Sequence, residues 1–204
     1  MSVHAVVPLK ALAVAKSRLA GVLSAPARER LVRTMLADVT AALLATRGIT
    51  RVHVLTADPG LVPPRCTHLA DDGDALNDAL RRAAGHLTRA GARAMLIVPA
   101  DLPAAEQSDF ALVLAAGEER GIVLVPDERG EGTNALLLTP PGLIAPQFGA
   151  RSLAAHLAAA RRVGIEPRIV RNAQLASDID DAGQLAELAA RREARYEFLQ
   201  SGAG

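Results

Sequence analysis

The chain has 204 residues, of which 50% are apolar and 22% are charged, so its composition is that of a folded globular protein and not of a disordered one. A formal net charge of +1 and an aromatic content of 2% exclude the basic surface and the stacking side chains that nucleic-acid binders use. With a single cysteine, Cys66, the chain forms no internal disulfide. We expect one domain over residues 1–204 and no nucleic-acid partner.

Alternating strand-like and helix-like segments organise the chain. The longest expected helix spans residues 24–47, because Ser24 is a typical N-cap and Gly48 a typical stop. Apolar residues four apart form one face of this helix, namely Leu31, Met35, Val39 and Leu43. In chain order we expect a strand over 3–9, this helix, a strand over 51–56, a helix over 75–90, a strand over 94–100, a helix over 106–119, strands over 121–127 and 133–141, a helix over 152–164, a strand over 166–171 and a helix over 181–200. The alternation predicts a three-layer α/β sandwich around a mostly parallel sheet.

Neither end of the chain nor any internal segment indicates a membrane protein. The opening MSVHAVVPLK lacks the charged start and the long apolar stretch of a signal peptide, and no apolar run approaches the length of a membrane span. The five histidines are scattered, and no pair has the spacing of zinc ligands. We therefore expect a cytoplasmic protein with no membrane partner.

One apolar strand ends on a carboxylate. Residues 94–100 read AMLIVPA, and Asp101 follows directly. In an open α/β sheet ligands bind at the carboxyl ends of the strands, and a buried carboxylate needs water, a partner or a metal ion. On its own, Asp101 is better explained as a turn or helix-capping residue before Leu102 and Pro103.

A second acidic segment, LASDIDDAGQL over residues 175–185, places Asp178 and Asp180 two positions apart. In an extended chain these two side chains point to the same side, where they repel each other unless a cation lies between them. Capping of the last helix by Asp180 or Asp181 explains one aspartate but not the pair. Mg²⁺ prefers one or two carboxylates together with phosphate oxygens and water, so Asp101, Asp178 and Asp180 predict a magnesium site.

Cationic side chains follow the first strand, at Lys10, Lys16 and Arg18. They are candidates for a clamp on a triphosphate, although the glycine-rich Walker pattern is absent. A solvated basic turn is the alternative. The segment ADDGDALNDALRRA over residues 70–83 contains Gly73, Leu76 and Asn77. An Asn at the top of the sheet could read a base edge, whereas a helix capped by Asp74 is the structural alternative.

Taken together, the segments resemble a known family. VVPLKALAVAKSRLAGVLS, DDGDALNDAL, VPADLP, VPDERGEGTNALLLTPP, FGARSLAAHLAAARRVG and DIDDAGQL occur in the order typical of the phosphoenolpyruvate and 2-phospho-L-lactate guanylyltransferases, which serve the biosynthesis of the deazaflavin coenzyme F-420. The resemblance runs from about residue 3 to residue 190. It implies a Rossmann-like nucleotidyltransferase fold of the nucleotide-diphospho-sugar transferase type.

The resemblance also implies roles for individual residues. It assigns the metal to Asp101, Asp178 and Asp180, the phosphorylated acid to Thr133, Gly149 and Ser152, and the guanine nucleotide to Gly73, Leu76 and Asn77. The residues themselves agree on the acid, because Gly149 permits unusual backbone angles and a helix that opens at Ser152 offers free N–H groups to an anion. An ordinary N-cap at Ser152 has the same geometry.

The sequence departs from the family pattern at two places. Ala75 stands where a second glycine is expected, and Ala150-Arg151 where Pro-Gly is expected. The second departure adds a charge beside the acceptor segment.

The expected reaction is attack by the phosphate of the acceptor on the α-phosphorus of GTP, with release of pyrophosphate. A phosphate monoester has a second pKa near ~6, so it is already a good nucleophile at neutral pH and needs no general base. The partners are therefore Mg²⁺, GTP and a small phosphorylated three-carbon acid; a downstream transferase of coenzyme biosynthesis is a further candidate, and an oligomer is left open.

Several alternatives also stay open. Phosphoenolpyruvate, 2-phospho-L-lactate and 3-phosphoglycerate differ by only a few atoms, so the sequence does not choose among them. Another enzyme of the same fold would act on a sugar phosphate or molybdopterin. A regulator that binds nucleotide without catalysis would not need all three aspartates.

Overall fold

A computed structural model describes residues 2–9, 16–73, 75–179, 181–191 and 193–199. Within these residues, seven strands form one sheet in the order β3-β2-β1-β4-β6-β5-β7. The strands are β1 (Val3–Pro8), β2 (Ile49–Thr56), β3 (Thr67–Ala70), β4 (Ala94–Ile97), β5 (Gly121–Pro126), β6 (Thr133–Thr139) and β7 (Arg168–Ile169).

Strand directions decide which residues meet at one edge of the sheet. β1 pairs in parallel with both β2 and β4, and β5 pairs in parallel with β7. β6 runs antiparallel between β4 and β5, with Ile97 opposite Leu136 and Pro126 opposite Thr133. The start of β6 therefore lies at the edge where β1, β4 and β5 end.

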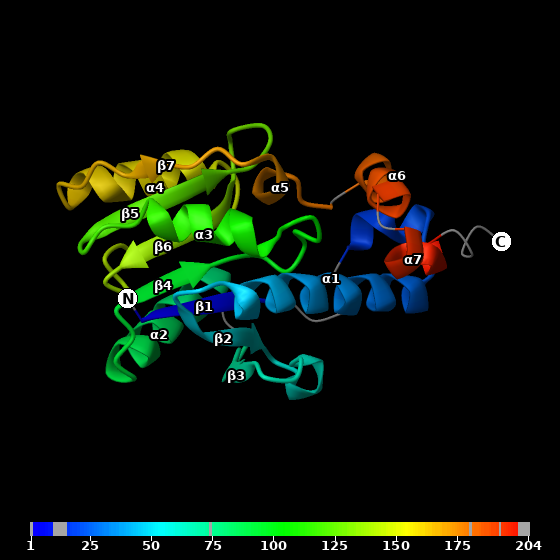
Figure 1. Cartoon of the computed structure of the whole chain (residues 1–204), viewed down its shortest axis with the longest axis horizontal. Helices are drawn as coiled ribbons and strands as arrows, with labels where there is room; N and C mark the ends of the chain where they lie inside the picture. The colour runs from blue at the N-terminus through cyan, green and yellow to red at the C-terminus, as the bar shows by residue number, and fades with distance from the viewer. Residues whose placement is uncertain (1, 10–15, 74, 180, 192, 200–204) are drawn as a thin grey trace.

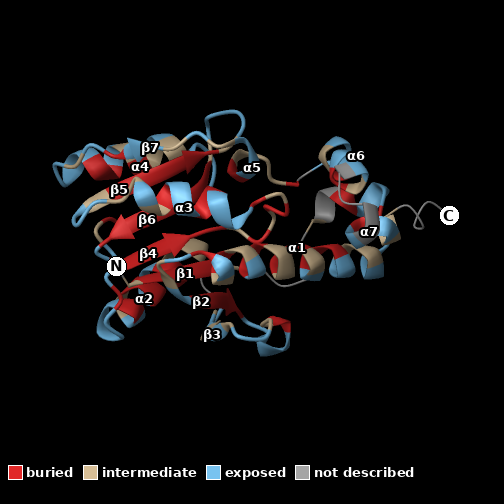
Figure 2. Cartoon of the chain, in the orientation of Figure 1, coloured by how far each residue is buried: buried red, intermediate tan, exposed pale blue. Residues whose placement is uncertain are grey.

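Helices cover both faces of the sheet (Figure 1). One apolar cluster joins a face of the sheet to α1 (Ala25–Ala45), α3 (Gln107–Ala115), α5 (Ala173–Ala176) and α6 (Ala182–Arg191). The other joins the opposite face to α2 (Leu76–Arg89) and α4 (Ser152–Arg162). Figure 2 shows buried residues through the strands and exposed ones along the outer sides of the helices. These three layers confirm the predicted sandwich and its mostly parallel sheet.

Local signals located most elements well. α1 begins after Ser24, whose side chain accepts a hydrogen bond from the amide of Ala27. The apolar residues of β4 are fully buried, as expected of a central strand covered on both faces. The short edge strand β3 was not predicted, because its residues are mostly exposed and show no apolar alternation.

The closing helix predicted over residues 181–200 corresponds to α6 and to α7 (Glu193–Tyr196), and the α-helical residues end at Tyr196. A 3-10 turn over Glu197–Leu199 follows. Tyr196 is fully buried, and its hydroxyl donates a hydrogen bond of 2.7 Å to Asp38 of α1. Figure 1 shows α6 and α7 beside the first half of α1, beyond the sheet. This contact between distant segments, which helical periodicity does not encode, fixes the path of the chain.

None of the described helices combines the length and the apolar character needed to cross a membrane.

Candidate active site at the carboxyl edge of the sheet

A lysine and an aspartate meet where β1 and β4 end. The Nζ atom of Lys16 lies 2.6 Å from Oδ2 of Asp101, and the two side chains are 9% and 26% exposed. Lys16 follows β1 and begins a 3-10 turn over Ser17–Gly21, and its own backbone is left-handed, with φ of 53°. The predicted strand over 94–100 ends earlier, at Ile97, and Asp101 lies in the turn that follows. Its partly buried carboxylate has a cation as its partner, as a carboxylate removed from water requires.

The second acidic segment lies against the first. The backbone amide of Ile179 donates a hydrogen bond of 3.2 Å to the carbonyl oxygen of Asp101. This bond holds the backbone of the second acidic segment, in which Asp178 directly precedes Ile179, against that of Asp101. Asp181 caps α6, since its carboxylate accepts from the amides of Gly183 and Gln184. The capping role considered for the aspartates therefore belongs to Asp181.

Asp180 and Lys10 lie outside the described residues, as does the side chain of Arg18. Among the residues that are described, no three His, Cys, Asp or Glu side chains gather as metal ligands. Asp101 and Asp178 are the described carboxylates of the predicted magnesium site, and both are partly accessible to solvent.

A tight turn delivers the start of β6 to the same edge. The carboxylate of Asp127 accepts from the amide of Glu131 at 2.8 Å, and the amide of Asp127 donates to the carbonyl of Gly132 at 3.2 Å. A Cβ at Gly132 would lie 2.7 Å from Oδ2 of Asp127, so the turn has no room for a side chain there. Thr133, the first residue of β6, follows directly and is only 6% exposed. Sequence reasoning did not single out Asp127.

Thr133 is bonded to a histidine that sequence reasoning also missed. Its Oγ1 atom lies 3.0 Å from Nδ1 of His156, and Nε2 of the same ring accepts from the amide of Gln147 at 2.8 Å. His156 is fully buried, and burial lowers its pKa to about 4. The one available signal was its spacing, because His156 lies four residues after Ser152 and so on the same face of α4.

The segment before α4 has an unusual backbone. Gly149 has φ of 134° and Arg151 has φ of 54°, and the amide of Ser152 donates to the carbonyl of Gly149. Arg151 occupies the N-cap position without a side-chain capping bond, so the alternative of Ser152 as the N-cap is wrong. Ser152 is the first residue of α4 and is buried. The amide of Leu153 donates to Glu131, which joins this helix start to the turn before β6.

The predicted nucleotide segment lies at the start of α2. Gly73 has φ of 85° and is exposed, and Leu76 begins the helix after Ala75. Asn77 is bonded to the other predicted segment: its Nδ2 donates to the carbonyl of Phe148 at 2.9 Å, and its Oδ1 accepts from the amide of Phe148 at 2.8 Å. The side-chain amide of Asn77 thus holds the segment that precedes α4 by two hydrogen bonds to its backbone.

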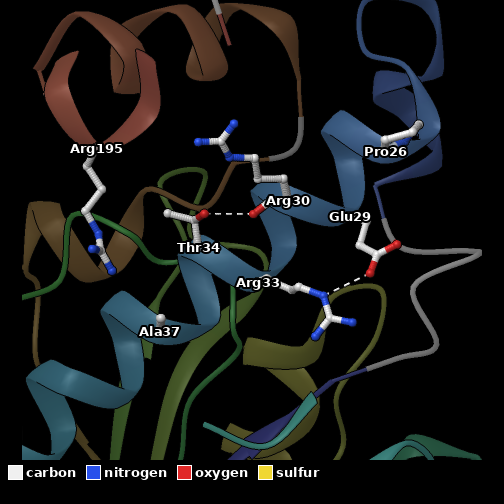
Figure 3. A pocket seen from close by; sticks show the side chains of 7 residues that line it. All are labelled: Pro26, Glu29, Arg30, Arg33, Thr34, Ala37 and Arg195. Carbon is white, nitrogen blue, oxygen red and sulfur yellow. Dashed lines mark hydrogen bonds and ion pairs between the residues drawn. The ribbon is translucent and has the colours of Figure 1, made fainter. Parts of the chain in front are cut away.

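A hollow of about 660 Å³ lies elsewhere, between α1 and α7 (Figure 3). Its three arginines already have partners: Arg33 is bonded to Glu29, Arg195 is bonded to Asp38, and the guanidinium of Arg30 lies 4.2 Å from the centroid of the Phe198 ring. None of the predicted site residues that the structure describes lines it. The lining residues are Pro26, Glu29, Arg30, Arg33, Thr34, Ala37 and Arg195.

Comparison with known protein families gives a match over nearly the whole chain. The model of the family described as "Guanylyl transferase CofC like" matches residues 3–201. Among named relatives, the phosphoenolpyruvate guanylyltransferase of Sphaerobacter thermophilus is 42% identical over 193 residues, which cover 93% of each chain. The phosphoenolpyruvate guanylyltransferase of Rubrobacter xylanophilus is 41% identical, over 96% of this chain and 98% of its own.

Solved structures support the fold independently of close sequence similarity. A putative nucleotide-diphospho-sugar transferase from Desulfovibrio desulfuricans superposes with a TM-score of 0.80 at 16% identity, covering 98% of this chain and 95% of its own. A CMP:2-keto-3-deoxy-manno-octonic acid synthetase in complex with CTP gives a TM-score of 0.64 at 14% identity, over 95% of this chain and 99% of its own. The predicted fold type is therefore confirmed.

Proposed function

Because this chain belongs to the family of CofC-like guanylyl transferases, we propose that it transfers GMP from GTP to phosphoenolpyruvate and releases pyrophosphate, in the biosynthesis of coenzyme F-420. Relatives that share about 40% of its residues over nearly their whole length bear the name of this activity. The match includes every segment that carries a predicted site residue.

The observation that carries the proposal is the meeting of Lys16 with Asp101 at the carboxyl edge of the sheet. This edge also holds Thr133, because β6 runs against β4 and begins where β4 ends. A nucleotidyltransferase needs cationic groups for a triphosphate and an anchor for a second anionic substrate at one place. This edge of the sheet supplies a candidate for each role, with Lys16 beside the end of β4 and Thr133 at the start of the neighbouring strand β6.

We also propose that Asp101 and Asp178, together with Asp180 outside the described residues, hold Mg²⁺. The fit rests on their chemistry, since carboxylate oxygens are ligands that Mg²⁺ prefers. It is also supported by the carboxylate of Asp101, which has a cationic partner in the ammonium group of Lys16. When bound, Mg²⁺ would neutralise negative charge on the phosphates of the nucleotide.

The chain's own residues would chiefly position the two substrates. The acceptor's phosphate has a second pKa near ~6, so it is mostly dianionic at neutral pH and needs no general base. Lys16 would reduce the repulsion between this nucleophile and the triphosphate, and the segments at Thr133 and Ser152 would hold the acceptor in line with the α-phosphorus. Gly73, Leu76 and Asn77 lie on the segment proposed to hold the guanine nucleotide.

Pyrophosphate release tests the proposal directly. The protein is incubated with Mg²⁺, with GTP, ATP or CTP, and with phosphoenolpyruvate, 2-phospho-L-lactate or 3-phosphoglycerate. We expect release that requires an acceptor and is fastest with GTP and phosphoenolpyruvate. Faster release with another acid would replace the acceptor but keep the enzyme class. No acceptor-dependent release with any pair would reject the activity.

A further inference from the structure

A fully buried histidine connects the two segments proposed to hold the acceptor. The ring of His156 bonds Thr133 at the start of β6 through Nδ1, and the amide of Gln147 through Nε2. The rings of Phe148 and His156 also meet in a T-shaped contact, with 5.1 Å between the ring centroids. The imidazole is therefore held by hydrogen bonds on both nitrogens and by one aromatic contact.

These contacts determine which nitrogen carries the proton. A backbone N–H can only donate, so Nε2 of His156 must be the bare, accepting nitrogen. In a neutral ring the proton is then on Nδ1, and this nitrogen must donate to Oγ1 of Thr133. Burial, which disfavours the charged ring, keeps the histidine neutral at ordinary pH.

The proton on Nδ1 of His156 determines how the hydroxyl of Thr133 can form hydrogen bonds. Because its oxygen already accepts from His156, its own hydrogen must point away from the ring, and the hydroxyl can donate it to another group. An anionic acceptor offers only acceptor oxygens, so a hydroxyl held in this direction suits it. The same hydroxyl, left free to rotate, would have to be ordered on binding at an entropic cost.

We propose that His156 is a positioning residue for the acceptor, which fixes the hydroxyl of Thr133 as a hydrogen-bond donor to a carboxylate or phosphate oxygen. This inference rests on the proposed function. It adds a residue that touches no substrate and acts only through Thr133.

Two substitutions of His156 distinguish its hydrogen bond to Thr133 from its hydrogen bond to the amide of Gln147. In His156→Asn the side-chain amide nitrogen takes the place of Nδ1, so the donor to Thr133 is kept. In His156→Gln the longer amide reaches toward the amide of Gln147, and the donor to Thr133 is lost. We expect the KM for phosphoenolpyruvate to rise roughly tenfold in His156→Gln and by less than about threefold in His156→Asn. The KM for GTP should change in neither variant.

A double-mutant cycle with Thr133→Val, which keeps the branched shape and removes the hydroxyl, tests whether His156 acts through Thr133. If it does, adding His156→Gln to Thr133→Val raises the acceptor KM no further. If the two effects multiply, or if the KM for GTP rises equally, the inference is wrong. His53→Gln serves as the control, because His53 is also buried but lies on β2, and both KM values should stay unchanged.

A spectroscopic measurement tests the role of His156 without depending on enzyme activity. Nitrogen NMR of the histidine side chains should show His156 neutral at pH 7, with the proton on Nδ1 and none on Nε2. The opposite tautomer would overturn the inference even in an active enzyme. If the wild type releases no pyrophosphate with phosphoenolpyruvate, the proposed function fails, and the tautomer still decides whether His156 directs the Thr133 hydroxyl.

Discussion

The side-chain amide of Asn77 makes two hydrogen bonds to the backbone of Phe148, one to its carbonyl oxygen and one from its amide, at 2.9 and 2.8 Å. The two residues are 71 positions apart in the chain. Asn77 lies in the first turn of α2, on the proposed nucleotide segment, and Phe148 directly precedes Gly149 on the proposed acceptor segment. An amide side chain can satisfy both polar groups of one peptide residue, so the two segments are held together as a unit.

We therefore expect Asn77→Ala to weaken the binding of both GTP and the acceptor. The variant should also lose about 2 kcal/mol of stability, because two partly buried hydrogen bonds contribute about 1 kcal/mol each. Calorimetric titration with each substrate, alongside chemical unfolding, measures both effects. The neighbouring Asp78→Ala is the control, since it removes only an exposed ion pair with Arg81. Unchanged affinity for both substrates in Asn77→Ala would contradict the bracing role.

Asp101→Asn should keep the fold and lose most of the turnover. The substitution preserves the size of the side chain and leaves the hydrogen bond from Ile179 to the backbone carbonyl intact. It removes the negative charge that faces Lys16 and, as proposed, the metal. We expect a loss of at least about a hundredfold in kcat, the scale of one lost electrostatic contact in a transition state.

Circular dichroism and pyrophosphate release, measured on the same preparation, separate folding from catalysis in this variant. Glu118→Gln is a matched control, because it neutralises an exposed carboxylate paired with Arg168 and should leave turnover within about twofold. Turnover near the wild-type level in Asp101→Asn would show that Asp101 does not act in catalysis.

Gly149→Ala should impair acceptor binding through the backbone alone. With φ of 134°, Gly149 adopts a conformation that side chains disfavour, although an added Cβ would meet no atom within 4 Å. Strain of this kind costs on the order of 1–3 kcal/mol, so the segment should shift and the acceptor KM should rise. The comparison variant is Arg151→Gly, whose φ of 54° already suits glycine. Equal effects of the two variants on acceptor KM would refute this explanation.

Stability should fall as the pH drops from about 6.5 to about 4. Burial lowers the pKa of His156 from 6.5 to about 4. The pKa of His53 is also lowered to about 4, mainly by burial and to a smaller extent by His4, His86 and Arg51. The folded pKa is below the unfolded one, so the unfolded chain binds more protons in this range and protonation favours unfolding. The stabilisation by neutral histidine is complete above pH 6.5, and each residue contributes on the order of 3 kcal/mol.

Denaturant unfolding at pH 7.5, 6, 5 and 4.5 measures this dependence. His53→Leu removes one titrating group and should make the decline with acidity shallower than in the wild type. A wild-type stability that is constant over this range would show that neither histidine is kept neutral by the fold.

Much of the architecture follows from local sequence. Ser24 caps the first helix as predicted, because capping depends only on neighbouring residues. The helix ends at Ala45 with an extended C-cap at Thr46, so Gly48 is not its stop. The apolar run before Asp101 predicts a central strand, since burial on both faces requires apolar side chains at every position. The order of the motifs along the chain was enough to indicate the family that the comparisons confirm.

Periodicity identifies the buried face of an element but not its neighbour or its direction. Residues 133–141 read as a strand, yet only the sheet shows that β6 runs antiparallel between β4 and β5 and so brings Thr133 to the edge where Asp101 lies. The same holds for the closing segment, where the buried Tyr196 bonds Asp38, 158 residues away.

The sequence alone therefore determined the order of the main helices and strands, the sandwich of three layers and the residue types that the chemistry requires. Only the tertiary structure decided which polar groups meet: Lys16 with Asp101, Asn77 with Phe148, and Thr133 with His156. The reason is physical, because a hydrogen bond depends on positions to within a few tenths of an ångström. Packing of the two apolar faces of the sheet sets those positions, and no local pattern in the chain encodes them.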